Sequence, residues 1–136
     1  MIKLNENTYQ IIAEGTHTFK VTKVDYDSDF GKLTVEMVTK DGLKDIERFN
    51  LINNNGETNE KAINAFSYLA RMVMNNPKLA GDFDEQELVG RYVTADVEHQ
   101  KLPSTKDPNK TVIFYKLSNY AAANGFDNAP VNIDDF

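Results

Sequence analysis

Two stretches of the sequence interleave basic and aromatic residues. The first, "HQKLPSTKDPNKTVIFYK", holds four lysines, one aspartate (Asp107) and the pair "FY". The second, "KDIERFN", holds Lys44, Arg48 and Phe49. Lysine neutralises phosphate, and an aromatic ring stacks on any base for about 1–3 kcal/mol, so this mixture is typical of surfaces that bind a single nucleic-acid strand. The residues predicted to contact DNA are Lys44, Arg48, Phe49, Lys101, Lys106, Lys110, Tyr115 and Lys116.

A strand turns successive side chains to opposite faces, which limits how many of these residues can meet one ligand. Of Phe114 and Tyr115 one must point inward, and we expect the tyrosine to be the outer one because its hydroxyl prefers water. Arg48 and Phe49 also fall on opposite faces, so both reach a ligand only if a bulge intervenes. The two faces of that stretch are Lys44, Ile46 and Arg48 on one side, and Asp45, Glu47 and Phe49 on the other.

Other kinds of chemistry lack the residues that they need. The chain has no cysteine, and neither His17 nor His99 has neighbours at zinc-ligand spacing. The stretch "DYDSDFG" resembles the start of a calcium loop, but the twelfth position is Glu36, within an expected strand. No glycine-rich phosphate loop occurs. We therefore expect a protein that is not an enzyme and has no metal ion or cofactor.

The composition indicates one domain with an uneven charge distribution. The 136 residues are 40% hydrophobic and carry a net charge of −6. Residues 121–136 hold three aspartates and no base, which leaves −3 on the rest of the chain. No apolar run approaches the roughly 20 residues that span a bilayer, and the first residues lack the pattern of a secretory signal. We expect a cytoplasmic protein with no membrane partner and with a basic patch on an acidic body.

Hydrophobic alternation predicts five strands, at residues 16–25, 32–40, 43–51, 91–99 and 111–120. The Asp-Gly turn at residues 40–42 is typical of an antiparallel hairpin between the second and third strands. Between the third and fourth strands, an apolar stripe at helical spacing predicts a helix over residues 60–76, capped by Thr58 or Asn59. Whether residues 8–14 add another strand stays open.

This order of elements is typical of an OB-fold, a five-stranded Greek-key barrel. We predict a mainly β domain with one helix over residues 1–120, and a disordered acidic tail over residues 121–136. In an OB-fold, single-stranded nucleic acid crosses the second and third strands and meets the loop between the fourth and fifth. Here the third strand and the loop over residues 100–110 hold the basic and aromatic residues named above. A generic α+β sheet would show a similar order.

Residues 15–120 resemble the small single-stranded-DNA-binding proteins carried by phages and prophages of Gram-positive bacteria. The resemblance rests on a "G-x-Y/F-x-V" opening strand, an "F-x-L" strand before the helix and "L-V/I-G-R/K" before the fourth strand. The matching residues are Gly15, Phe19, Val21, Phe49, Leu51 and residues 88–91. The resemblance implies a protein that coats single-stranded DNA during phage replication and recombination, often as a dimer or higher oligomer.

The chain ends in "NIDDF", which resembles the acidic tip with which bacterial single-stranded-DNA-binding proteins dock on replication and repair partners. In such a tip the acids steer toward a basic pocket and the terminal ring fills an apolar hole. The matching residues are Ile133, Asp134, Asp135 and Phe136, with fewer aspartates than usual and no proline before the phenylalanine. Because the tail is acidic, we also expect it to cover the basic groove when DNA is absent.

A second interpretation comes from a different class of protein. The same barrel would bind a host protein as an interaction module, with its acidic surface mimicking nucleic acid, and the net charge of −6 fits this as well. Salt dependence separates the two. Three or four phosphate contacts would give a log–log slope of about −2 to −3, at roughly −0.7 per contact. An interaction module would show no affinity for DNA.

Overall fold

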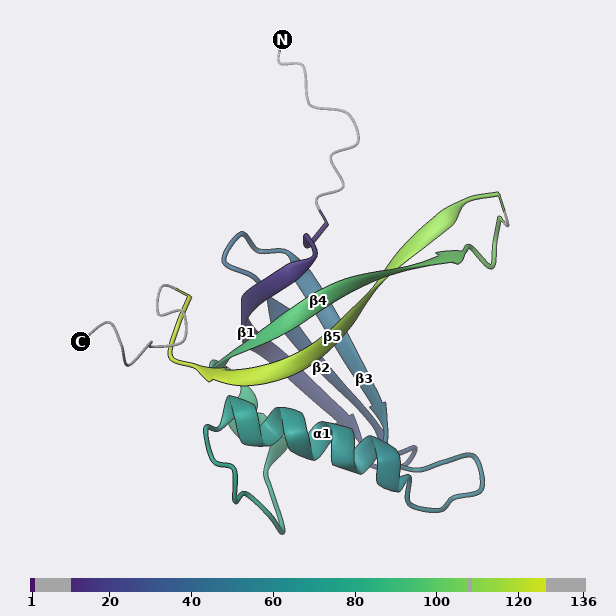
Figure 1. The fold of residues 1–136 in the computed structure, drawn as a ribbon. Helices are drawn as coiled ribbons and strands as arrows, with labels where there is room; N and C mark the ends of the chain where they lie inside the picture. The colour runs from purple at the N-terminus through teal and green to yellow at the C-terminus, as the bar shows by residue number, and fades with distance from the viewer. Residues whose placement is uncertain (2–10, 108, 127–136) are drawn as a thin grey trace, which may run out of the picture.

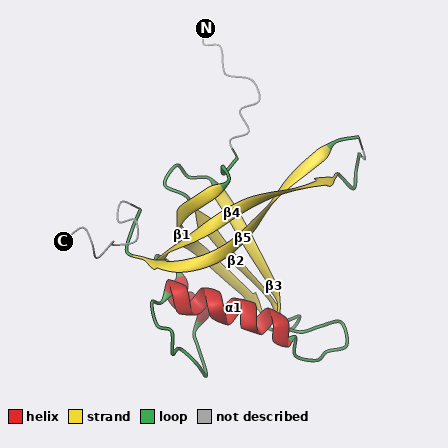
Figure 2. Ribbon diagram, viewed as in Figure 1, coloured by secondary structure: helices red, strands yellow, loops and turns green. Residues whose placement is uncertain are grey.

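The computed structural model describes residue 1, residues 11–107 and residues 109–126. These residues form five strands and one α-helix, with a short 3₁₀ helix before the fourth strand (Figures 1 and 2). The expected order of three strands, a helix and two strands is confirmed. No helix among the described residues is long and apolar enough to cross a membrane. The elements are β1 (Gly15–Asp27), β2 (Lys32–Val38), β3 (Lys44–Asn50), α1 (Glu60–Val73), η1 (Glu85–Leu88), β4 (Tyr92–Pro103) and β5 (Thr111–Ala123).

The five strands form one antiparallel sheet in the order β3-β2-β1-β4-β5. The central strand, β1, pairs with β2 through its second half and with β4 through its first half. The sheet curves around its inner face (Figure 1) but is not closed. Its two edge strands, β3 and β5, share no backbone pairing among the described residues. We call this open side between β3 and β5 the seam.

The inner face of the sheet carries the hydrophobic core. Burial alternates along β2 with a period of two, as the sequence predicts. Ile12, which precedes β1, is also fully buried and adds to this core. The largest fully buried side chains are Phe19, Ile12, Met37, Leu69, Leu88, Val21, Val35, Val93 and Val97.

Helix α1 begins where the sequence indicates. Asn59 is its N-cap, and the Asn59 side chain accepts a hydrogen bond from the backbone N–H of Ala62, which satisfies one of the free donors of the first turn. The predicted apolar stripe faces the sheet, and its buried members are Phe66, Leu69, Ala70 and Val73.

The helix lies across one end of the sheet (Figure 2) and contacts both edge strands. Phe66 packs edge-on against Phe49 of β3, with the ring centroids 5.5 Å apart. Tyr68 lies 5.7 Å, ring to ring, from Tyr120 of β5, and its hydroxyl donates a hydrogen bond to the Tyr120 carbonyl oxygen. The helix therefore connects β3 to β5 through side chains at the seam, where backbone pairing is missing.

Strand β4 is longer than the sequence indicates, because it continues to Pro103 in register with β5. The predicted start of the loop, at residue 100, is therefore wrong, because the loop begins at residue 104. Backbone pairing with β5 extends β4 over residues 100–103, none of which is buried, so the burial pattern of an alternating strand could not mark its end.

Strand β5 is also longer than expected. It continues to Ala123, three residues into the segment assigned to the tail, and these three alanines pair with Tyr92, Val93 and Thr94 of β4. The remainder of the expected tail from residue 127 lies outside the described residues. The possible extra strand over residues 8–14 is only partly described: residues 8–10 lie outside the described residues, and residues 11–14 form no strand.

Candidate nucleic-acid interface

The outward-facing side chains of β1, β2 and β3 form a mixed charged surface, which we call the sheet surface. The register places them in rows across the strands, as with Lys20, Val38 and Lys44. The expected alternation along β3 is confirmed, since its outward residues are exposed. Five bases and three acids lie among the members: Lys20, Lys23, Asp25, Asp27, Lys32, Thr34, Glu36, Val38, Lys44, Ile46, Arg48 and Asn50.

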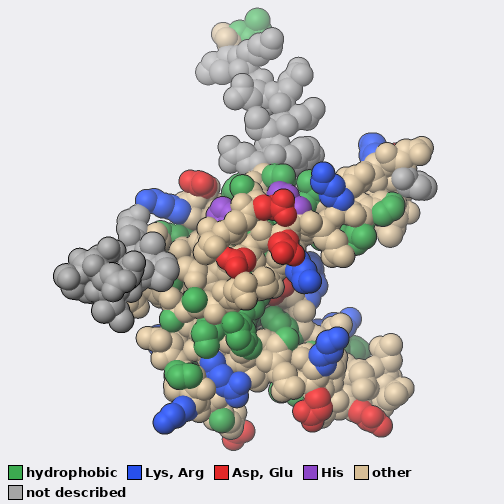
Figure 3. Space-filling model, in the orientation of Figure 1, with side chains coloured by type: hydrophobic (Ala, Val, Ile, Leu, Met, Phe, Trp, Pro, Cys, Tyr) green, Lys and Arg blue, Asp and Glu red, His purple; other side chains and the backbone are tan. Residues whose placement is uncertain are grey.

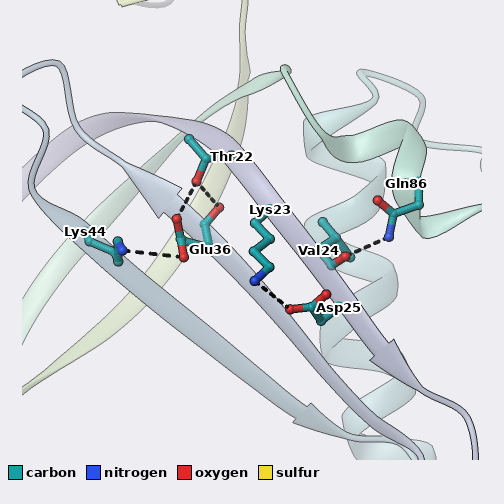
Figure 4. Close-up of polar contacts among 7 residues, drawn as sticks. All are labelled: Thr22, Lys23, Val24, Asp25, Glu36, Lys44 and Gln86. Carbon is teal, nitrogen blue, oxygen red and sulfur yellow. Dashed lines mark hydrogen bonds and ion pairs between the residues drawn. The ribbon is translucent and has the colours of Figure 1, made fainter.

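Carboxylates of the same surface hold two of its bases (Figure 4). The Lys44 Nζ atom lies 3.6 Å from Glu36 Oε2, and the Thr22 hydroxyl donates a 3.0 Å hydrogen bond to Glu36 Oε1. Lys23 Nζ lies 3.3 Å from Asp25 Oδ2. All four charged groups keep contact with solvent, so each ion pair is weak and can open for a phosphate.

The β4–β5 hairpin extends beyond the body as a two-stranded projection over residues 98–116, which we call the arm (Figure 1). Backbone hydrogen bonds organise its tip: the Ser104 N–H donates to the Lys110 carbonyl, and the Lys110 N–H donates to the Asp107 carbonyl. The four lysines expected to contact DNA are all exposed on the arm, at residues 101, 106, 110 and 116. Within the described part of the chain, none of the four forms an ion pair with a carboxylate.

An exposed apolar stripe runs along one face of the arm. Leu102 and Val112 lie directly opposite each other, and Phe114, paired with Gln100, is 49% exposed. Figure 3 shows apolar and cationic side chains together on this projection at the upper right. Strand β4 alternates from Tyr92, which lies beside Lys20, so the stripe is on the same side of the sheet as the sheet surface.

Neither predicted stacking residue is exposed. The Phe49 ring is buried against Phe66 and faces the core. Tyr115 is half-buried on the inner side, and Phe114 is the outer member of the pair, so the expected orientation of these two residues is wrong. The preference of a phenol for water does not decide this case, because the Tyr115 hydroxyl finds a partner inside the protein.

That partner is the backbone of the buried residue Ile12. The Ile12 N–H donates a 3.0 Å hydrogen bond to the Tyr115 hydroxyl, and a 2.6 Å hydrogen bond joins His99 Nε2 to the Ile12 carbonyl. The rings of His99 and Tyr115 are neighbours, with centroids 5.8 Å apart. These two residues therefore hold the backbone of Ile12 in place. As expected, His17 and His99 are both strand residues.

Two acids, Asp45 and Glu47, lie on the inner face of β3. The sequence placed them on one face of the strand but did not indicate that this face is buried. Burial raises the pKa of Glu47 from 4.5 to about 8 and the pKa of Asp45 from 3.8 to about 6. The two side chains share a hydrogen bond, in which the protonated Glu47 is the donor, and the nearby Arg48 partly opposes both shifts. Tyr120 faces this pair from β5, and its own burial together with the two acids raises its pKa.

The structure thus separates the predicted site residues into three groups. Lys44 and Arg48 lie on the sheet surface; Lys101, Lys106, Lys110 and Lys116 lie on the arm; Phe49 and Tyr115 point inward. The predicted partner-binding residues, Ile133, Asp134, Asp135 and Phe136, lie outside the described residues. Four exposed aromatic residues were not among the predicted contact residues: Tyr26, Phe30, Tyr68 and Phe114.

No family model matches this chain, and no curated protein matches it either.

Proposed function

We propose that this protein binds single-stranded DNA with little sequence preference. The observation that carries the proposal is the arm, where four exposed lysines form no ion pair within the described residues and the exposed ring of Phe114 lies on the same side of the sheet as the sheet surface. Lysines bind successive phosphates, and an exposed ring accepts any base. Arg48 and Lys44 extend the same cationic path over β3. The stacking residue in this proposal is Phe114, in place of Tyr115 and Phe49.

We further propose that the curved sheet is an OB-fold. The support is topological: β1 pairs with both β2 and β4, the helix falls between β3 and β4, and the seam lies between β3 and β5, where an OB barrel closes. In that fold the β2–β3 face and the β4–β5 loop bind oligonucleotides, and these are the regions that carry the cations here.

The biological setting is part of the same proposal. The protein would coat DNA during phage replication and recombination in the bacterial cytoplasm, assemble as a dimer or higher oligomer, and recruit partners through residues 133–136. These three points rest on the resemblance of the sequence to single-stranded-DNA-binding proteins. A truncation after Phe126 tests the tip, because it spares the alanines of β5 that pair with β4. We expect this variant to bind DNA more tightly than the full chain at low salt and to lose its protein partners. Unchanged or weaker DNA binding would contradict the tail as a cover for the groove.

Fluorescence anisotropy tests the main proposal. The probe is a labelled oligothymidine of about 30 nucleotides, longer than the roughly 4–16 nucleotides that one OB-fold covers. We expect tight, salt-sensitive binding to this strand and weak binding to its duplex counterpart. Absence of binding to either probe at low salt would overturn the proposal in favour of a protein-interaction module.

A further inference from the structure

The turn between β1 and β2 and the loop after β3 enclose an open pocket of about 710 Å³. Phe30 and Lys32 line it from the turn, and Asn50, Ile52 and Asn54 line it from the other side. The volume is within the range of about 300–1,000 Å³ that is typical of small-ligand sites. We call this cavity the loop pocket.

Close packing and hydrogen bonds hold the walls of the loop pocket in place. A Cβ atom added at Gly31 would lie 2.5 Å from the Ile52 side chain, so only glycine lets the turn and the loop approach this closely. The Gly31 carbonyl accepts a 2.7 Å hydrogen bond from the Leu51 N–H. The Asn53 side chain accepts hydrogen bonds from two backbone N–H groups of its own loop. The pocket is therefore formed before any ligand arrives.

Several groups on these walls are free for a ligand. The Phe30 ring is 66% exposed, and the Lys32 ammonium lies 6.0 Å from its centroid. The side-chain amides of Asn50 and Asn54 form no hydrogen bond within the described residues. An amide both donates and accepts hydrogen bonds, which matches the edge of a nucleobase. A ring, two amides and one cation correspond to the base and the phosphate of one nucleotide.

The loop pocket continues the sheet surface. Lys32 and Asn50 lie opposite each other in the β2–β3 register, next to the row of Thr34 and Arg48. Lys44 begins β3 at the level of Lys20, on the side toward the arm, and Asn50 ends it at the far side. A strand that leaves the arm and follows β3 therefore arrives at this pocket.

We propose that the loop pocket binds one nucleobase at the end of the bound DNA strand. Phe30 stacks on the base, the amides of Asn50 and Asn54 bond to its edge, and Lys32 contacts the adjoining phosphate. This inference rests on the proposed function. It adds a site that distinguishes among bases to a surface that otherwise contacts only phosphates and the faces of base rings.

A tryptophan reporter tests the pocket directly, since the chain contains no tryptophan. In Phe30→Trp, stacking of a base should quench the new fluorescence as oligothymidine is added. Tyr68→Trp, an exposed position on α1, is the matched control and should not respond. Quenching in Phe30→Trp alone supports the pocket. If Phe30→Trp binds the strand by anisotropy but its fluorescence is not quenched, the pocket is overturned and the proposed function stays intact. If the wild-type chain does not bind DNA at all, the pocket and the proposed function are both overturned.

Two further variants measure how much the pocket contributes. Phe30→Ala should weaken binding of single-stranded DNA by about 5- to 150-fold, the range for one base–aromatic stack. Asn50→Ala combined with Asn54→Ala should reduce the differences in affinity among oligothymidine, oligocytidine and oligoadenosine. All three positions are exposed or in loops, so circular dichroism should show an unchanged fold. Unchanged affinity in Phe30→Ala and an unchanged ranking of the three oligomers would also overturn the pocket.

Discussion

The sheet surface and the arm both carry lysines, but they differ in what accompanies the charge. On the sheet surface, Glu36 and Asp25 hold Lys44 and Lys23 in ion pairs. On the arm, the lysines have no carboxylate partner within the described residues, and an apolar stripe with Phe114 runs along one face of the hairpin. A cation that is already paired must exchange one anion for another when DNA binds, so it contributes less to affinity. We therefore expect the arm to supply most of the binding and the sheet surface to set the path.

The strongest test of this comparison removes the charge of the arm. Replacing Lys101, Lys106, Lys110 and Lys116 together by alanine should weaken binding of single-stranded DNA by about 100-fold or more at low salt. The log–log salt slope should shrink by about 2–3, because each lost phosphate contact removes roughly 0.7. Anisotropy titrations at several salt concentrations measure both quantities.

The control for this prediction removes the same number of lysines at another place on the protein. Lys61→Ala combined with Lys78→Ala, in α1 and the loop after it, should be compared with Lys106→Ala combined with Lys110→Ala at the tip of the arm. Equal losses in the two pairs would show that only net charge matters, and the arm would then have no special role.

A smaller effect is expected from the aromatic part of the arm. Phe114→Ala should lower affinity by about tenfold and leave the salt slope unchanged, because stacking involves no counterion release. Phe114→Tyr should bind nearly as well as the wild type. Phe49→Leu is the contrasting variant: its ring is buried against Phe66, so it should lose stability in urea while the folded protein keeps its affinity. The reverse pattern would return the stacking role to Phe49.

The inner face of β3 provides the next contrast, since we expect its acids to affect the stability of the fold and not the binding of DNA. Glu47 has its pKa raised to about 8 by burial, whereas an unfolded chain ionises it near 4.5. The unfolded state therefore loses this proton first, so the contribution of Glu47 to stability is complete below about pH 4.5 and declines as the pH rises to about 8. The raised pKa of Asp45, about 6, acts in the same direction.

Glu47→Gln should remove this loss, because a glutamine amide stays neutral and still donates a hydrogen bond to Asp45. We expect a gain on the order of 1–2 kcal/mol in the free energy of unfolding at pH 8 and little gain at pH 4.5. Urea titrations at the two pH values measure it, with DNA affinity unchanged. A gain of equal size at both pH values would show that the carboxyl of Glu47 does not titrate between them.

Parts of this molecule could be predicted from sequence because they depend on local patterns. Alternation located all five strands, and the spacing of apolar residues from Phe66 to Val73 located the helix. The ends of β4 and β5 could not be predicted, because those residues are held by pairing between strands rather than by an apolar face. The orientation of Tyr115 depends on Ile12, which lies 103 residues away in the chain. Phe30 is a lone aromatic in a turn, and only the fold brings the asparagines of another loop beside it.

The smallest expected effect is a gain in DNA affinity when one ion pair of the sheet surface is removed. Glu36→Gln frees Lys44 from its carboxylate partner and removes one negative charge from the path of the DNA. An exposed ion pair contributes at most about 1 kcal/mol, so affinity should rise by about two- to fivefold at low salt, with little change near 0.5 M salt. Asp82→Asn is the charge-matched control, because Asp82 is an exposed loop residue outside the sheet surface and should leave affinity unchanged. If Glu36→Gln does not strengthen binding, Lys44 does not contact phosphate, and the DNA path would pass along the arm without following β3.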